Sequence, residues 1–320
     1  MKPARRRKLV EHQWFFLLLF VIIISLIAGT RNSRYFWLGN ISNLLGQISV
    51  LSLAACGATI LIIAGEIDIS VGANIGLSTV LMAMLMRNGW DGWVAAGIGV
   101  LVSLLCSMAV GAASIVFHAP SFIVSLACIG VFQGTALFIT QGTLQTIYGQ
   151  FETLASVKLF NFLPLLFIVA LLGYLITFFI LAHTQLGRSV YAIGNNPRAA
   201  YLAGINIRRQ KLVFFALNGL FVGGAGMLLL SRVGAAQPST GSGIELQAIG
   251  SVVIGGAPMT GGKGDTVGTF FGVLLWGVIG NALNIMQVNA YVQDVIFGVL
   301  IVFAVALSSL RLRAQRATGQ

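Results

Sequence analysis

Two apolar stretches joined by a short polar segment decide the fold: NLLGQISVLSLAACGATILIIAGEIDISVGANIGLSTVLMAMLM, residues 43–86. The joint reads GEIDISVG at 65–72 and carries two carboxylates, Glu66 and Asp68. A carboxylate inside an apolar span is costly. Residues 41–86 are numerous enough for two spans, so the joint predicts a turn between two helices.

Four residues of this joint suit a turn followed by a helix start. Gly65 permits the turn, Asp68 or Ser70 can cap the next helix, and Gly72 lies in its first turn. We therefore expect Asp68 to anchor a helix start near the cytoplasmic side and not to bind a solute.

Composition excludes a soluble protein. The 320 residues are 57% hydrophobic and 8% charged, whereas soluble domains carry about 25% charged residues. Cys56, Cys106 and Cys128 lie in apolar segments and read as buried thiols, and the three histidines lack metal-ligand spacing. The chain is therefore expected to be an all-α integral membrane protein that binds no metal.

The apolar segments predict about ten spans, some of them short or broken. The first follows a basic N-terminus without a clear cleavage site, so it reads as an uncleaved span. A shorter, glycine-rich stretch at 244–257 is the candidate tenth. The other nine are 14–30, 44–64, 71–86, 94–117, 121–140, 162–182, 212–231, 266–287 and 290–309.

The basic residues predict that both termini face the cytoplasm. Threading ten spans alternately from a cytoplasmic N-terminus places fourteen Lys and Arg residues inside and five outside. Residues 1–320 then form one membrane domain, with a basic N-terminus (1–13), a long inner loop (183–211) and a basic tail (310–320). The +11 net charge reflects this orientation and not nucleic-acid binding.

The inner loop encodes a short capped helix in GNNPRAAYLAGI, residues 194–205. Asn196 can cap it, Pro197 suits its first position, and Gly204 fits the left-handed residue that closes it. The surface mixes Arg198, Tyr201 and Leu202, which favours docking of a cytoplasmic partner. The alternative is an amphipathic helix lying on lipid headgroups.

A second glycine-rich stretch, IGGAPMTGGKGDTVG at 254–268, does not bind nucleotide. A phosphate-binding loop needs Ser or Thr after its lysine, and Gly264 follows Lys263. We expect a cytoplasmic turn through Gly261 and Gly262, with Asp265 at the start of the next helix. DTVG at 265–268 echoes DISVG at 68–72. No catalytic constellation appears, so an enzyme is not predicted.

Three motifs together resemble the permease subunits of bacterial ABC importers for ribose and other simple sugars, and more distantly the branched-chain amino acid permeases. They are GEIDISVG, TQLGRSVYAIGNNPRAAYLAGINIRRQK and GIELQAIGSVVIGGAPMTGGKGDTVGTFFGVLLWGVIGNALNIMQV, and the resemblance spans about 40–309. Many relatives have glycine where this chain has Glu66, and GGAPMTGG also departs from the usual pattern. The resemblance implies a type II importer fold with about ten helices.

The resemblance also implies partners. A second permease subunit, two cytoplasmic ATPases that bind ATP and magnesium, and a periplasmic sugar-binding protein would complete the importer, and this chain would hold no cofactor. Residues 197–203 would be the coupling helix. The sequence leaves open whether Glu66 faces the ATPase or the cytoplasmic mouth. The residues assigned to coupling are Gly187, Arg188, Asn195, Asn196, Pro197, Arg198, Ala199, Ala200, Tyr201 and Gly204.

Polar side chains within the spans are candidates for the sugar pathway, and hydrogen bonding between helices is the alternative for each. They are Asn43, Gln47, Gln133, Asn218, Asn281 and Asn284. Other functions stay open, namely a stand-alone carrier or channel for a small polar solute, or an ABC permease for a nucleoside or an autoinducer.

Overall fold

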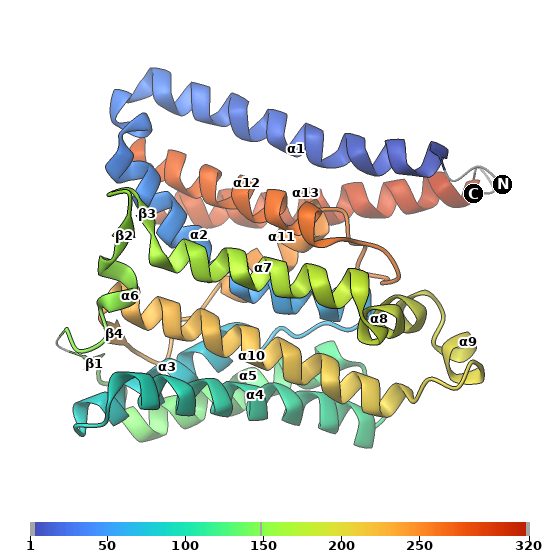
Figure 1. The fold of residues 1–320 in the computed structure, drawn as a ribbon, viewed down its shortest axis with the longest axis horizontal. Helices are drawn as coiled ribbons and strands as arrows, with labels where there is room; N and C mark the ends of the chain where they lie inside the picture. Colours follow the sequence, from blue (N-terminus) through green and yellow to red (C-terminus); the bar gives the residue numbers. More distant parts are fainter. Residues whose placement is uncertain (1–3, 148, 318–320) are drawn as a thin grey trace.

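The structure, a computed structural model, describes residues 4–147 and 149–317 and is almost entirely helical (Figure 1). Seven described helices are long and apolar enough to cross a membrane. They are α1 (Ala4–Arg31), α2 (Leu38–Ile63), α4 (Gly92–Val116), α5 (Ser121–Thr140), α7 (Leu165–His183), α10 (Ile207–Val233) and α12 (Thr266–Ile285). Their composition indicates a multi-pass membrane protein.

Three further helices are apolar over shorter lengths: α3 (Val71–Arg87), α11 (Ile244–Ile254) and the first part of α13 (Ala290–Ala317). Every one of the ten predicted segments is thus helical over most of its length, including the glycine-rich candidate at 244–257. That all ten cross the membrane stays a prediction.

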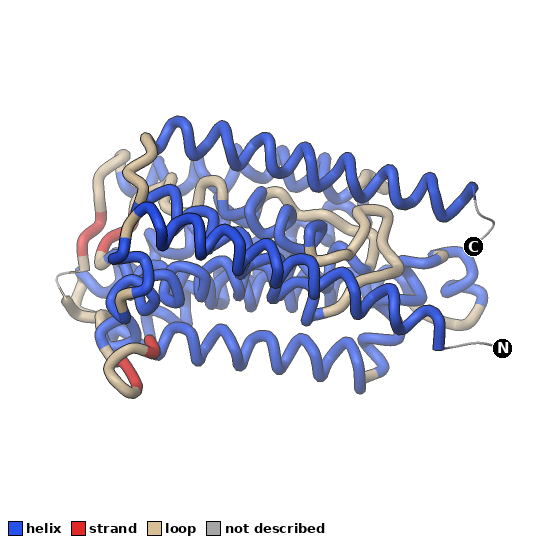
Figure 2. The backbone as a smooth tube through the Cα atoms, turned by 90° about the horizontal axis from the view of Figure 1, so that it is seen from above, coloured by secondary structure: helices blue, strands red, loops and turns tan. Residues whose placement is uncertain are grey.

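The remaining elements are short and lie at the two ends of the bundle (Figures 1 and 2). One end holds α8 (Gln185–Asn195) and α9 (Pro197–Leu202) together with the described ends of α1 and α13. Following the charge count, we name this the cytoplasmic end. The other, the outer end, holds η1 (Ser33–Phe36), α6 (Thr153–Ser156), β1 (Gln145–Thr146), β2 (Lys158–Leu159), β3 (Leu163–Pro164) and β4 (Ala235–Ala236).

Two small antiparallel ladders close the outer end. β1 pairs with β4, with Gln145 opposite Ala236, and β2 pairs with β3, with Lys158 opposite Pro164. The predicted outer loop at 141–161 therefore bonds to the loop after α10 and does not stand free.

Helix α2 forms the centre of the bundle. It packs against α7, α10, α11 and α12, and 94% of its most apolar window is buried. A helix that is apolar on every face is expected in such a position. Its small residues permit close approach; a Cβ at Gly57, for example, would lie 3.1 Å from the Cα of Asn218 in α10.

Two non-helical segments enter the bundle from opposite ends. Residues 64–70, which we name the joint segment, run inward from the cytoplasmic end to α3 (Figure 1). Residues 237–243 run inward from the outer end to α11. The two meet at α3, where a Cβ on Gly72 would lie 2.5 Å from the carbonyl oxygen of Gly241. Such irregular backbone is tolerated at membrane depth because protein surrounds it.

Close backbone contact between α11 and α12 predicts that Gly272 does not tolerate a larger residue. A Cβ at Gly272 would collide with the carbonyl of Ser251, whereas a Cβ at Gly298 in α13 meets no atom within 4 Å. We expect Gly272→Ala to cost about 1–3 kcal/mol through overpacking. Thermal unfolding of the purified protein measures this. Gly298→Ala is the matched control, and equal melting temperatures for the two variants would contradict the packing.

Candidate functional site

A cavity of ≈ 60 Å³ lies between α2, α11, α12 and α13. Gln47 lies roughly 14 Å along α2 from its outer end at 1.5 Å per residue, and Asn284 lies near the outer end of α12. The cavity therefore belongs to the outer half of the bundle. Its lining comprises Gln47, Ile48, Leu51, Gln247, Trp276, Gly277, Gly280, Asn284, Gln293 and Phe297.

Amides and aromatic rings give the cavity its chemistry. Gln293 donates from Nε2 to Oδ1 of Asn284 at 3.0 Å. The rings of Trp276 and Phe297 are stacked, with centroids 5.1 Å apart. The indole N–H of Trp276 is buried and has no hydrogen-bond partner among the described residues. Since none of the described lining residues is charged, the site suits a neutral solute that donates and accepts hydrogen bonds.

The cavity is too small for such a solute in this conformation. Pockets for small molecules typically enclose about 300–1,000 Å³, against ≈ 60 Å³ here. The surrounding helices must separate before a molecule larger than a few waters enters. The structure therefore shows this region in a closed arrangement.

The six polar residues predicted for a pathway separate into three groups. Gln47 and Asn284 line the cavity. Asn281 and Asn218 instead bond to other helices: Asn281 exchanges hydrogen bonds of 2.8 and 2.9 Å with Asn40, and Asn218 bonds to Asp68 and Ser107. Asn43 is exposed and Gln133 half-buried, and neither lines the cavity.

Asp68 is the centre of a buried polar network. Its Oδ1 accepts hydrogen bonds from the backbone N–H of Ser70 at 2.9 Å and from the Ser70 hydroxyl at 2.5 Å. Its Oδ2 accepts from Nδ2 of Asn218 at 3.0 Å and from the hydroxyl of Ser107 at 3.3 Å. The carboxylate thus joins the start of α3 to α4 and α10, and it is 4% exposed.

The depth of Asp68 corrects one expectation. The sequence placed it near the cytoplasmic side, but its partner Asn218 lies eleven residues into α10, about 16 Å from the cytoplasmic start of that helix. The helix start was predicted correctly and the depth was not, because the joint segment is not a tight surface turn. It continues into the bundle, so that α3 begins in the interior, and the carboxylate is satisfied there by hydrogen-bond donors.

The second predicted turn lies at the cytoplasmic end against α8. Gly261, Gly262 and Gly264 all have positive φ. Asn195 donates to the carbonyl oxygen of Gly262 at 3.0 Å, and the Tyr191 hydroxyl donates to that of Gly264 at 2.8 Å. Burial, with the nearby Asp265 carboxylate, raises the pKa of Tyr191 to about 12, so the hydroxyl keeps its proton as a donor.

Asp265 and Asp68 share a position at a helix start but differ in depth. Asp265 accepts at Oδ1 from the N–H of Gly268 at 2.6 Å and so caps α12 at the cytoplasmic end, one residue after Gly264. Lys263 belongs to the same turn. The sequence echo between DISVG and DTVG therefore marks two helix starts, one at the end of the bundle and one within it.

The inner loop folds into α8 and α9. The Asn196 side chain accepts from the N–H of Ala199 at 3.0 Å, Pro197 opens α9, and Gly204 has φ +85°. Tyr201 and Leu202 are 67% and 79% exposed, so α9 presents an apolar tip at the cytoplasmic end (Figure 1).

The residues assigned to coupling do not all face outward. Gly187 is packed against the end of α7, where a Cβ would collide with the carbonyls of Ile180 and Leu181. Ala200 is buried, whereas Arg188 and Arg198 are exposed. Asn195 is occupied by the turn at Gly262.

Four polar residues at or near the site were not predicted from the sequence. Gln247 and Gln293 line the cavity, each one turn into a helix, and both lie inside predicted spans, at 244–257 and 290–309, where they were not singled out. Glu245 lies in the first turn of α11, a position that the helix dipole favours for an acid, and its Oε2 is buried without a described partner. Lys211 forms an ion pair with Glu66 at 2.7 Å.

Comparison with known proteins finds one family and several curated relatives. The profile of the branched-chain amino acid transport system permease component matches residues 40–305. The ribose import permease of Bacillus subtilis (strain 168) is 38% identical over 91% of both chains. The D-allose permease of Escherichia coli K12 is 36% identical over 90% of this chain and 89% of its own length.

A further relative acts on a different kind of solute. The autoinducer 2 import system permease of Escherichia coli O9:H4 is 30% identical over 92% of this chain and 86% of its own length. No solved structure gives a significant match to this chain.

The Asp68 network predicts a large stability loss on truncation. Asp68→Ala removes the acceptor shared by Ser70, Ser107 and Asn218 in the interior and leaves Asn218 only its bond to Ser107, which we expect to cost about 3 kcal/mol. Thermal unfolding in detergent is the measurement. Asp294→Ala, at an exposed carboxylate of α13, is the control. An Asp68→Ala protein as stable as the control would refute the anchoring role.

Proposed function

Because the chain belongs to the family of branched-chain amino acid transport permease components, it is a membrane-embedded transport subunit and not an enzyme, and we propose that it imports a simple sugar. The named substrates of two relatives, ribose and allose, support this substrate class. The observation that carries the proposal is the uncharged cavity of amides and stacked rings between α2, α11, α12 and α13.

The chemistry of the cavity fits a monosaccharide. Gln47, Gln247, Asn284 and Gln293 supply donors and acceptors for hydroxyl groups, and the Trp276 N–H is an additional free donor among the described groups. An aromatic face packs against the C–H face of a sugar ring. The stand-alone carrier gains no support from the relatives.

In the proposed importer, the energy for transport comes from ATP hydrolysis by a partner protein and not from this chain. Permeases of ABC importers work with an ATPase and a substrate-binding protein. We propose that α9 enters a groove of the ATPase, which binds ATP and magnesium, and that a second permease subunit completes the pathway. Displacement of α9 by the closing ATPases would then open the cavity toward one end of the bundle at a time.

Substitutions in α2 test the cavity. Gln47→Ala removes a cavity amide, and Asn43→Ala removes an exposed amide one helical turn away. We expect Gln47→Ala to lower uptake of labelled ribose or allose about tenfold, the effect of one lost hydrogen bond of roughly 1.4 kcal/mol. Uptake is measured in the native host after deletion of the gene and complementation. Equal uptake by both variants would place the sugar elsewhere.

Substitutions in α9 test the docking surface. Tyr201→Ala with Leu202→Ala removes the exposed apolar tip and should abolish co-purification of an ATPase subunit with the permease, because hot spots at interfaces are apolar or aromatic anchors. Val116→Ala with Phe117→Ala, at an exposed apolar pair on the end of α4, is the control. If α9 instead lies on lipid headgroups, the ATPase stays bound to the Tyr201 and Leu202 variant.

A further inference from the structure

The joint segment lies between α5 and α10 and is bonded to both. On one side its backbone donates to two serines of α5: the N–H of Ile67 to Ser121 Oγ at 3.1 Å, and the N–H of Ile69 to Ser125 Oγ at 3.0 Å. Ser121 and Ser125 are one helical turn apart. The alternate residues Glu66 and Asp68 point their carboxylates to the other side, toward α10.

Helix α10 holds both carboxylates. Lys211 pairs with Glu66 at 2.7 Å, and Asn218 donates to Asp68 at 3.0 Å. Lys211 and Asn218 are two helical turns apart and so share one face of α10. Two side chains on the same side of the joint segment thus bond to two residues on one face of α10. The segment must therefore follow α10 when that helix moves.

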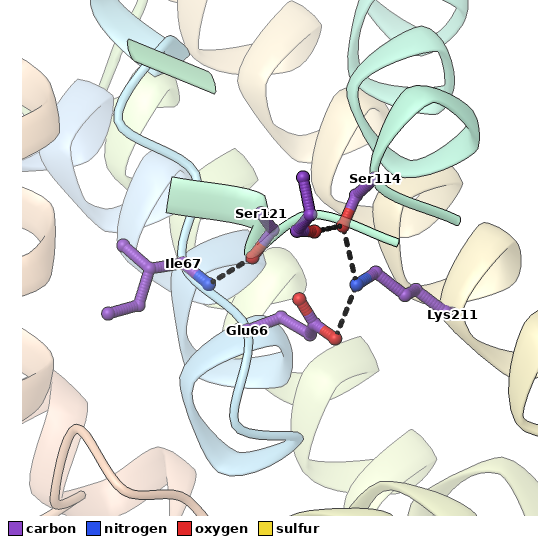
Figure 3. A network of polar contacts seen from close by, with 6 residues as sticks. Glu66, Ile67, Ser114, Ser121 and Lys211 are labelled. Carbon is purple, nitrogen blue, oxygen red and sulfur yellow. Dashed lines mark hydrogen bonds and ion pairs between the residues drawn. The ribbon is translucent and has the colours of Figure 1, made fainter. Parts of the chain in front are cut away.

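The ion pair extends to α4 (Figure 3). Lys211 Nζ also donates to Ser114 Oγ at 2.8 Å, and the Ser114 hydroxyl donates to the carbonyl of Ala119 at 2.6 Å. The side chains of Lys211 and Glu66 are only 15% and 20% exposed. Removal of one partner therefore leaves a largely buried charge, which is more disruptive than loss of a surface pair.

This network lies between α9, the proposed docking helix, and the proposed sugar cavity. Lys211 lies in the first turns of α10, which begins five residues after α9 ends. The joint segment leads directly into α3, whose first turns pack against Pro238, Gly241 and Glu245, the last of these in the first turn of α11. Helix α11 in turn contributes Gln247 to the cavity. A continuous set of contacts thus runs from the docking surface to the cavity.

We infer that the joint segment is a mechanical link, in which Glu66 and Asp68 make α3 follow the movement of α10 that α9 receives at the cytoplasmic end. Glu66 and Lys211 are positioning residues in this link and do not contact the solute. The inference rests on the proposed function for the source of the movement, but the attachment itself is a property of this chain alone.

Hydrogen exchange of the full-length protein in lipid nanodiscs tests the attachment. We expect Lys211→Met to accelerate amide exchange in residues 65–70 at least tenfold, because the unpaired Glu66 draws the segment toward water. Arg209→Met, at an exposed position two residues earlier, should match the wild type. Glu66→Gln serves as a second variant if Lys211→Met does not fold. Wild-type exchange in whichever variant folds would overturn the link.

Transport by the assembled complex tests the consequence. Glu66→Gln and Lys211→Met should retain ATP hydrolysis but lose labelled-ribose uptake at least fivefold, and the exchanged pair, Glu66→Lys with Lys211→Glu, should recover part of it. A parallel loss of protein yield, ATP hydrolysis and uptake would indicate a purely structural role and would overturn the inference. An unchanged ratio of uptake to hydrolysis also overturns it. Absence of sugar uptake by the wild type would refute the proposed function, whereas the exchange measurement would still decide the link.

Discussion

The rest of the structure depends on one constraint, that backbone without helical hydrogen bonds must find partners when it enters the membrane interior. In the joint segment, most of the N–H groups meet this constraint. The N–H groups of Gly65 and Glu66 bond back to α2, those of Ile67 and Ile69 bond to serines of α5, and that of Ser70 bonds to Asp68. These backbone bonds fix the segment to α2 and α5, and the carboxylates of Glu66 and Asp68 fix it to α10.

Short helices follow from the same constraint. Since the joint segment and residues 237–243 both occupy part of the membrane depth, α3 and α11 can begin in the interior beside one another. Their first turns carry polar backbone groups and attract the acids Asp68 and Glu245. The interior start of α11 also brings Gln247 to the cavity, next to side chains of α2, α12 and α13. The proposed sugar site is therefore a consequence of the broken helices.

Much of this fold could be read from the sequence, because apolar length and the distribution of Lys and Arg are local signals. The capped helix at Pro197 and the cap that Asp265 forms on α12 were predictable for the same reason: their hydrogen bonds are made within a few residues. The depth of Asp68 was not, since it depends on Asn218, 150 positions away. Nor were Gln247 and Gln293, which reach the cavity beside Gln47 only when distant helices pack, or Lys211, whose partner Glu66 is 145 positions away. Spacing within one span cannot separate Gln47, which lines the cavity, from Asn43, which is exposed.

The most direct test of the account is an experimental structure of the assembled transporter in lipid with labelled or heavy-atom-substituted sugar bound. The account predicts density for the sugar beside Gln47 and Trp276, with α11 and α13 moved apart, and with Glu66 and Asp68 still held by Lys211 and Asn218. Sugar density away from these helices, or a joint segment detached from α10 while the transporter is active, would contradict it.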